Sequence, residues 1–383
     1  MSNEFETSRI IGGLGIVASE LTNCFVQYGA RVTLITHHSE SELQVKDCGP
    51  LQIIHLPDRE PFYSAAKKKN QYEPTVVWLR RNQWPLPDVI HIHSVCFANL
   101  AHYYRKVHGI PIVYTCHSLV KQEARTAGRG IVSDRQERLC TLADRIVVPS
   151  NWLKNVLQTN YPECKRKIDV IENGIRRTAP HDKKQRTSLL FVGRLTRQKG
   201  IEELLAAVAM LAKRAPYVKL TIIGRASTAA YQARLITLVK KWKLEPYVKW
   251  LGFLPPQQVA KQYAKHGVVI VPSKQESFGL VALEALANGI ALASTRSGGL
   301  SQFVSSKVAE VIPAVTSRAI AGSVINIWRD GSRTEERIRA GFKRTEMYDW
   351  RKIAARYMAL FERLPKHPIE STTAVQLEDG RHD

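Results

Sequence analysis

Long apolar runs and paired cysteines are both missing from this chain. The 383-residue sequence has no stretch of 18 or more apolar residues, which argues against a membrane-spanning helix. Its first six residues, Met-Ser-Asn-Glu-Phe-Glu, also lack the basic and apolar regions of a signal peptide. The six cysteines form no Cys-x-x-Cys pair, which indicates buried thiols in a reducing compartment rather than a zinc or disulfide framework. We therefore expect a cytoplasmic protein.

Acidic residues are scarce relative to basic ones. The chain has 56 Lys and Arg against 34 Asp and Glu, which gives a formal net charge of +22. Such an excess indicates a polyanionic neighbour: nucleic acid, an anionic membrane surface or phosphate-rich ligands. No zinc-finger spacing, RNP-type aromatic motif or basic zipper accompanies it, so a nucleic-acid partner is disfavoured. A solvated basic surface without a partner is the alternative.

Short apolar strands alternate with amphipathic helices, as in parallel α/β layers. A polar stretch around Gly174 and Pro180 interrupts this alternation, which then starts again. A chain of this length exceeds what one core supports, so we expect two α/β domains. We place an N-terminal domain at 1–173, a linker at 174–187, a C-terminal domain at 188–348, a terminal helix at 349–366 and a disordered tail at 367–383.

The strands expected in the first half are 31–36, 51–56, 88–93, 111–116, 145–149 and 167–172. Those expected in the second half are 188–193, 219–224, 248–251, 268–272 and 290–294. The expected helices include 13–28, 98–108, 133–143, 151–159, 201–213, 229–242, 256–266, 280–288 and 350–364. Ser150 is the expected N-cap of the fourth of these, because its hydroxyl can accept from a backbone N–H of the first turn.

Three motifs carry the chemistry. Gly12-Gly13-Leu14-Gly15 opens a helical segment, where glycines let the backbone approach a phosphate; a tight turn is the alternative. A strand ending at Gly193 leads into a loop with Arg194, Arg197 and Lys199, cations that suit a diphosphate. A solvated basic loop is the alternative.

The third motif contains two glutamates. Glu276 follows the expected strand 268–272, and Glu284 lies in the second turn of the helix that begins near Gly279 and Leu280. Carboxylates of this kind accept hydrogen bonds from vicinal hydroxyls, as in ribose binding. An apolar helix is also a poor place for an unpaired acid. A structural ion pair remains the alternative for Glu284.

In their order and spacing, these motifs resemble the retaining glycosyltransferases of family 4, which have the GT-B fold. The resemblance covers nearly the whole chain. It also includes Tyr114-Thr-Cys-His117-Ser, Asp144-Arg-Ile-Val-Val-Pro-Ser150 and Val170-Ile-Glu-Asn173-Gly174-Ile. It implies two Rossmann-like domains that face each other across a donor-binding cleft, with the C-terminal helix crossing back to the N-terminal domain.

The resemblance also implies roles for individual residues. Arg194 and Lys199 would hold the diphosphate of a nucleoside-diphosphate sugar and stabilise the leaving group. Glu284 would bind the ribose hydroxyls, Glu276 the transferred sugar, and His117 would point at that sugar. The implied catalytic set is His117, Arg194, Lys199 and Glu276. The implied donor-binding set is Gly13, Gly15, Arg194, Lys199, Gly252, Leu254, Glu276, Phe278, Gly279, Leu280 and Glu284.

The implied reaction retains configuration at the anomeric carbon and uses no metal, in keeping with the lack of an Asp-x-Asp pair. The expected donor is a UDP-linked hexose. The expected acceptor is a glycan or a lipid-linked sugar in cell-surface polysaccharide or glycoconjugate synthesis, and no cofactor is expected. Family members begin with an apolar strand before the glycine loop, whereas only Met1–Phe5 precedes Glu6 here. We therefore expect this strand to be shortened or absent, through a misassigned start or a sheet without its central strand.

Alternative functions share parts of this pattern. A glycogen or starch synthase has the same fold, although such synthases are longer and carry a lysine where this chain has Ile10-Ile11. A sugar-nucleotide 2-epimerase lacks the Gly-Arg-Leu and Lys-Gly combination found here. From another class, a basic nucleic-acid-binding protein or a non-catalytic sugar-nucleotide-binding protein would explain the charge but not the paired glutamates.

The segment 60–87 is long for a loop in such a domain. It combines Lys67-Lys68-Lys69 and Arg80-Arg81 with Phe62, Tyr63, Tyr72, Trp78 and Trp84. Cations with interleaved aromatics suit a membrane interface. We therefore expect reversible, peripheral contact with the inner face of the plasma membrane. The alternative is that the aromatics cover the N-terminal core while the lysines face water.

Overall fold

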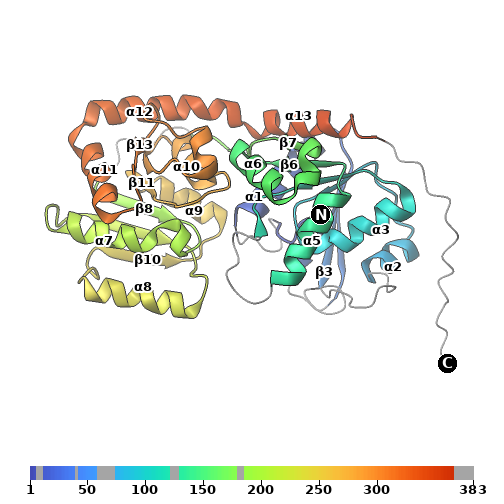
Figure 1. Cartoon of the computed structure of the whole chain (residues 1–383), viewed down its shortest axis with the longest axis horizontal. Coiled ribbons are helices and arrows are strands. Elements are labelled where there is room, and N and C mark those ends of the chain that lie inside the picture. Colours follow the sequence, from blue (N-terminus) through green and yellow to red (C-terminus); the bar gives the residue numbers. More distant parts are fainter. Residues whose placement is uncertain (6–11, 39–41, 58–73, 121–128, 179–184, 366–383) are drawn as a thin grey trace.

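The computed structural model describes residues 1–5, 12–38, 42–57, 74–120, 129–178 and 185–365. They form two α/β units, with the strands of each unit covered by helices (Figure 1). The expected tail 367–383 and the middle of the expected linker, 179–184, lie outside the described residues. Strand and helix thus alternate as the sequence indicated, and the break in the alternation falls between β7 and β8.

The first unit holds two sheets, with strand orders β1-β3-β2 and β4-β5-β6-β7. All pairs are parallel except β2 with β3. The strands are β1 Val32–His38, β2 Gln44–Cys48, β3 Leu51–Pro57, β4 Ile90–Ile92, β5 Ile112–Thr115, β6 Arg145–Val148 and β7 Ile168–Val170. The helices are α1 Gly13–Gln27, α2 Pro74–Arg81, α3 Ala98–His108, α5 Arg129–Leu142 and α6 Asn151–Asn160.

The first residues of the chain lie between β1 and β4. The Ser2 N–H donates to the Ile35 carbonyl of β1 (3.1 Å), while the Met1 carbonyl accepts from the His93 N–H just past β4 (2.9 Å). Phe5 is buried with Leu34 beneath the three-stranded sheet. The described residues Met1–Phe5 therefore occupy the position between the two sheets, which agrees with the expected shortened first strand.

The second unit has one six-stranded parallel sheet of order β10-β9-β8-β11-β12-β13. Its strands are β8 Ser188–Val192, β9 Lys219–Ile223, β10 Val248–Gly252, β11 Val268–Val271, β12 Ala291–Ser294 and β13 Glu310–Val311. Its helices are α7 Ile201–Ala212, α8 Ala229–Lys241, α9 Pro256–Tyr263, α10 Leu280–Ala287, α11 Ser317–Arg329 and α12 Gly331–Arg344. The chain runs outward from β8 through β9 to β10 and then crosses back to β11 on the other side of β8. The loops after β8 and β11 therefore emerge side by side at one edge.

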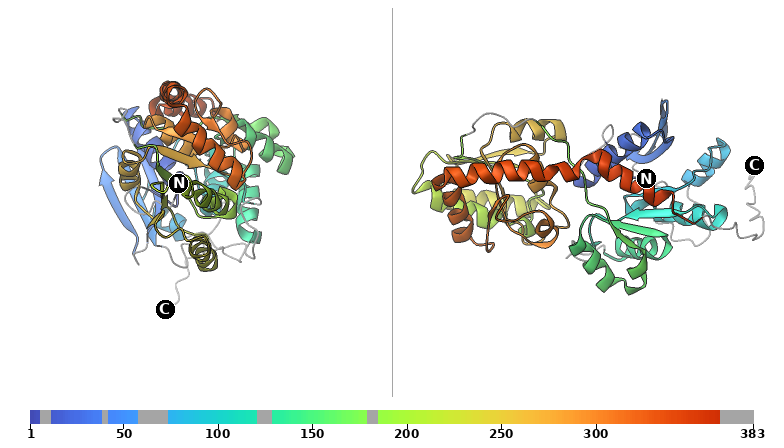
Figure 2. Two further views of the ribbon diagram at one scale, coloured as in Figure 1. Left: turned by 90° about the vertical axis from the view of Figure 1, so that its left-hand side faces the viewer. Right: turned by 90° about the horizontal axis from the view of Figure 1, so that it is seen from above.

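Helix α13, Trp350–Phe361, follows α12 and runs back over the first unit (Figures 1 and 2). Its buried face, with Trp350, Ile353 and Tyr357, packs on Val17 and Leu21 of α1. The Asp349 carboxylate caps the helix by accepting from the Arg351 N–H (2.8 Å). This confirms the expected terminal helix and its return to the N-terminal unit.

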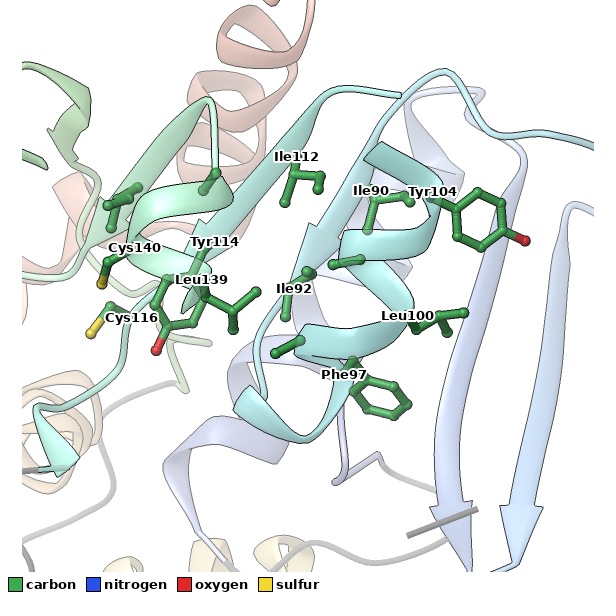
Figure 3. Packing of buried hydrophobic residues seen from close by; sticks show 14 of the residues in the cluster. Ile90, Ile92, Phe97, Leu100, Tyr104, Ile112, Tyr114, Cys116, Leu139 and Cys140 are labelled. Carbon is green, nitrogen blue, oxygen red and sulfur yellow. The ribbon is translucent and has the colours of Figure 1, made fainter. Parts of the chain in front are cut away.

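The two faces of the β4–β5 ladder carry different side chains. Ile90, Ile92 and Ile112 point to the face covered by α3 and α5, where they form part of a closed apolar core (Figure 3). Residues of opposite parity point away from this core, because side chains alternate along a strand. Those residues include His91 and Thr115, which are considered below with the site.

Half of the segment expected to touch a membrane, 60–73, lies outside the described residues, and the other half contains helix α2 where a loop was expected. In its described part, Trp78 and Trp84 pack, partly buried, against the N-terminal core, with ring centroids 5.7 Å apart. Arg80 and Arg81 at the end of α2 are exposed. Trp78 and Trp84 therefore cover the core, as the alternative interpretation held. Membrane contact by the segment as a whole stays a prediction.

A substitution at Gly174 tests how tightly the returning helix is packed. A Cβ atom on buried Gly174 would lie 2.3 Å from Cδ2 of Trp350, so Gly174→Ala must displace a buried indole. Overpacking of this kind costs about 1–3 kcal/mol of unfolding free energy. Urea unfolding of the variant and the wild type measures this loss.

Gly322→Ala is the matched control. Gly322 lies inside α11, and no atom is within 4 Å of its added Cβ. Alanine is favoured over glycine in a helix by about 1 kcal/mol, so this variant should be at least as stable as the wild type. Equal stability of the two variants would show that Trp350 does not pack on Gly174 in solution.

Candidate active site

The loops after β8 and β11 meet at the carboxyl edge of the C-terminal sheet. The Lys274 N–H donates to the Gln198 carbonyl (2.7 Å), which joins the two loops directly. Across this join, Lys199 Nζ lies 2.5 Å from Glu276 Oε1. The Ser273 hydroxyl donates to the same carboxylate oxygen (2.9 Å). Two predicted site residues, Lys199 and Glu276, are thus brought together as a mostly buried ion pair.

Close backbone packing holds the Glu276 loop in place. The Gly299 N–H donates to the Glu276 carbonyl (2.8 Å). A Cβ on Gly298, whose φ is +60°, would lie 2.2 Å from that same carbonyl oxygen. Only glycine allows both this φ and this approach. Glu276 is therefore positioned by its backbone as well as by its side-chain partners.

Glu284, in the second turn of α10, is paired with a tyrosine rather than a cation. Its Oε2 accepts from the hydroxyl of Tyr263, at the end of α9 (2.5 Å). Burial raises the pKa of Glu284 to about 7, and the Tyr263 hydrogen bond opposes this only in part. The alternative of a structural ion pair is therefore not what the structure shows. The carboxyl group is held where it can gain hydrogen bonds from hydroxyl groups.

The two units contact each other beside these loops. A Cβ on Gly13, the first residue of α1, would lie 2.8 Å from Leu280 Cδ1, at the first residue of α10. The Ser150 hydroxyl donates to the Ser277 carbonyl (2.6 Å) and accepts from the Leu153 N–H (3.1 Å). Ser150 is therefore the N-cap that the sequence predicted, and it also bonds to the opposite unit. The N-termini of α1 and α10, each carrying partial positive charge, therefore approach each other at the contact between Gly13 and Leu280.

Arg225 is a residue that sequence reasoning missed. It follows Gly224 at the end of β9, and its guanidinium lies 4.9 Å from the ring centroid of Phe253, in the loop after β10. Its carbonyl accepts from the Leu195 N–H (2.8 Å), while the Gly224 N–H donates to the Gly252 carbonyl (2.7 Å). Arg225 thus stands between the loop with Arg194 and the loop with Gly252. The available signal was a cation directly after a strand-ending glycine.

His117 lies past the end of β5, on the N-terminal side. Its Nε2 is 3.0 Å from Nδ1 of His93, and the two rings are stacked with centroids 5.3 Å apart. Burial lowers the pKa of His117 to about 4 and that of His93 well below its usual range. Both rings are therefore neutral near pH 7. His93 was not predicted as a site residue, although its spacing from His91 placed both on one strand face.

The remaining predicted residues differ in how far they are buried. Phe278 is buried against Phe303 and Tyr348, so its side chain belongs to the core and only its backbone faces the loop. Arg194 is exposed directly after Gly193, and Gly252 has open space at its Cβ position. Gly15 is buried inside α1, while Leu254 packs on the C-terminal core. No contact joins His117 to the Lys199–Glu276 pair among the described residues.

The lengths of the helices and the positions of possible metal ligands are known for the described part of the chain. None of its helices combines the length and the apolar character needed to cross a bilayer. Nor do its His, Cys, Asp and Glu residues gather in groups of three or more that could hold a metal ion.

The raised pKa of Glu284 predicts a pH-dependent stability difference. A carboxyl group whose pKa rises on folding stabilises the protein most below its unfolded value, near 4.5, and loses this effect as the pH rises through about 7. Glu284→Gln lacks this titration. Relative to the variant, the wild type should therefore lose up to about 3 kcal/mol between pH 4.5 and 8. Denaturant unfolding at several pH values measures the difference.

Glu336→Gln provides the control, since Glu336 is an exposed carboxyl on α12. It should track the wild type at every pH. A constant offset between wild type and Glu284→Gln from pH 5 to 8 would contradict the raised pKa.

Comparison with known protein families agrees with this geometry. Residues 11–178 match the model described as Glycosyltransferase Family 4, and residues 175–344 match Glycosyl transferases group 1. The D-inositol 3-phosphate glycosyltransferase of Corynebacterium diphtheriae is 33% identical over 56% of this chain and 56% of its own length. The glycogen synthase of Mycobacterium tuberculosis is 30% identical over 70% of this chain and 67% of its own length. The match to the first relative thus spans little more than half of that enzyme.

Solved structures share the fold across almost the whole chain. Sucrose-phosphate synthase from Thermosynechococcus elongatus superposes with a TM-score of 0.76 at 22% identity, covering 95% of this chain and 96% of that one. HepE from Anabaena superposes with a TM-score of 0.71 at 18% identity, covering 94% and 98%. The α/β layers are therefore those of the GT-B fold, with two Rossmann-like domains. The chain belongs to the family 4 glycosyltransferases.

Proposed function

We propose that the protein is a retaining, metal-independent glycosyltransferase that moves a hexose from a nucleoside-diphosphate sugar to a glycan or lipid-linked acceptor. The observation that carries this proposal is the set of groups at the junction of the two domains. Lys199 and Glu276 are paired there, and Glu284 is held by Tyr263. The N-termini of α1 and α10 approach each other beside them.

The charges at this junction suit a diphosphate leaving group. Departure of the sugar leaves negative charge on the nucleoside diphosphate. Lys199, Arg194 and the N-terminus of α10 supply fixed positive potential where that charge develops. In this proposal Lys199 leaves Glu276 and binds the diphosphate. The carboxylate of Glu276 then accepts hydrogen bonds from hydroxyls of the transferred sugar. The neutral ring of His117 would contact the same sugar from the N-terminal domain.

The raised pKa of Glu284 fits ribose binding. The ribose 2′- and 3′-hydroxyls can donate to its carboxylate, which favours the ionised form and lowers the pKa on binding. Binding would therefore release a proton near neutral pH. Burial in the free protein raises the pKa of Glu284, whereas hydrogen bonds from the ribose in the complex would lower it.

Arg225 supports a donor with a keto-bearing base. A guanidinium can only donate hydrogen bonds. Uracil presents keto oxygens that accept them, whereas the exocyclic amino group of adenine also donates. In this proposal Arg225, which lies over Phe253 between the two loops, donates to an acceptor on the base. We therefore favour UDP, the nucleotide present in the solved HepE structure, over ADP.

A glucan acceptor is the second candidate. It rests on the match to the glycogen synthase of Mycobacterium tuberculosis, which is 30% identical and matched over 67% of its own length. Radiolabelled sugar nucleotides with glucan and lipid-linked acceptors separate these products. Reversible contact with the inner face of the plasma membrane stays part of the first candidate. Co-sedimentation with anionic vesicles tests it.

The first functional prediction concerns turnover. Arg194→Ala and Lys199→Ala should each lower kcat by about 100-fold or more, because each removes positive charge from the leaving group. Product formation from a labelled donor measures this, and EDTA should leave the wild-type rate unchanged. Lys213→Ala, at an exposed position after α7, is the control and should keep wild-type turnover. Near-normal turnover in both site variants would refute the diphosphate assignment.

The second functional prediction concerns the base. The wild type should bind UDP more tightly than ADP, and Arg225→Gln should reduce that ratio by about 10-fold, the value of one hydrogen bond to a charged donor. Calorimetric titration with both nucleotides gives the ratio. Arg214→Gln, an exposed arginine after α7, serves as control. An unchanged ratio in Arg225→Gln would remove Arg225 from base selection.

A further inference from the structure

Four polar side chains form an array on one face of the N-terminal sheet. Strands β4 and β5 pair in parallel, with His91 opposite Val113. His91 and His93 share one strand face, and Thr115 and His117 share the corresponding face of the next strand. Each residue bonds to one on the other strand. His91 Nε2 lies 2.7 Å from Thr115 Oγ1, and His93 Nδ1 lies 3.0 Å from His117 Nε2.

The hydrogen bond between His93 and His117 decides which nitrogen of His117 can meet a ligand. Both rings are neutral, since burial lowers both pKa values. The bond therefore contains a single proton, carried by either His93 Nδ1 or His117 Nε2. In both cases Nε2 of His117 is engaged. Nδ1 is the nitrogen that remains for a ligand, as a donor in the first case and as an acceptor in the second.

The array is supported from behind by the helix that returns from the C-terminal domain. The Tyr357 hydroxyl of α13 lies 3.1 Å from Thr115 Oγ1. The ring of Tyr357 lies 5.1 Å from that of His91, which in turn lies 4.2 Å from that of His93. Tyr357 and Thr115 are buried, as is His93. A buried, hydrogen-bonded array of this kind leaves its members few alternative positions.

We propose that His93 is a positioning residue that holds the ring of His117 with Nδ1 directed at the transferred sugar. The ring of His91 packs against His93 and holds it in place. Tyr357 of the returning helix supports His91 through Thr115. The inference rests on the proposed function for the identity of the ligand. The hydrogen bond and the tautomer of His117 can be measured without a ligand. A role confined to stability would leave that tautomer and the rate per folded molecule unchanged.

The test compares three substitutions at His93. Asn places a polar atom near the position of Nδ1, Gln places one near Nε2, and Leu removes both. We expect Leu and Gln to lower kcat by roughly 10-fold or more, with the KM for the donor changed by less than about 3-fold, because the reacting geometry is misplaced. Asn should restore most of the rate. His102→Leu, an exposed histidine of α3, is the control and should match the wild type.

Nitrogen-15 NMR of the free protein supplies the second measurement. The imidazole shifts of His117 should report a different tautomer balance in the Leu and Gln variants, and a wild-type balance in the Asn variant. An unchanged balance in all three, or equal rates for Asn and Gln, would overturn the positioning role. If the Leu variant does not fold, the comparison of Asn with Gln still decides. If the wild type transfers no sugar, the proposed function fails, while the NMR result still tests the hydrogen bond.

Discussion

The packing of α13 on the N-terminal domain sets the geometry of everything at the domain junction. Trp350 lies against the backbone of Gly174, where the chain leaves the N-terminal domain. From there α13 packs along α1. The other end of α1 contacts Leu280 at the start of α10. Since close-packed interiors transmit displacements, a shift of Trp350 would move α1 relative to α10. One helix therefore connects the two domains beside the junction, and its Tyr357 also supports the histidine array.

The charges at the junction are balanced without a donor. Lys199 is paired with Glu276, Glu284 has a raised pKa and a tyrosine partner, and burial keeps the ring of His117 neutral. This balance has a physical reason: an unpaired charge in a partly buried site is costly. Under the proposed function, a diphosphate would bring negative charge to Lys199, and a ribose would bring hydrogen-bond donors to Glu284. Donor binding would therefore replace each existing partner with a ligand group, rather than fill an empty charged pocket.

The sequence predicted most elements with strong apolar patterns, but it missed helix α11 despite its buried Ile320, Val324 and Ile327. The strands of the C-terminal sheet were expected because each is a short apolar run, except for β13, a two-residue strand. Strand β2 was missed because all five of its residues are exposed. Helix α12 was missed because its pattern is polar, with only Thr334 and Gly341 buried.

In the site, the motifs that end strands were predictable, because parallel strands bring their carboxyl ends to one edge. The partners supplied by distant elements were not. Ser150 was expected as an N-cap, yet its bond to Ser277 joins residues 127 positions apart. Tyr263 was not singled out in the sequence, and only the fold brings it to Glu284. Patterns in one amino-acid sequence indicate local structure, whereas pairings between distant residues depend on the three-dimensional arrangement.

The contacts between the two domains at the junction differ in kind from the packing of α13. They are few and mostly polar: Ser150 with the Ser277 carbonyl, the Asn151 N–H with Gln302, and Gln302 with Glu172. A hydrogen bond of this type contributes about 1 kcal/mol net, because water can replace either partner. The α1–α13 interface instead buries large apolar side chains, each worth about 1.5–3 kcal/mol. The junction can therefore open at low cost while α13 stays in place. This is what a site needs if a bulky nucleotide must enter and leave between two domains without unfolding either.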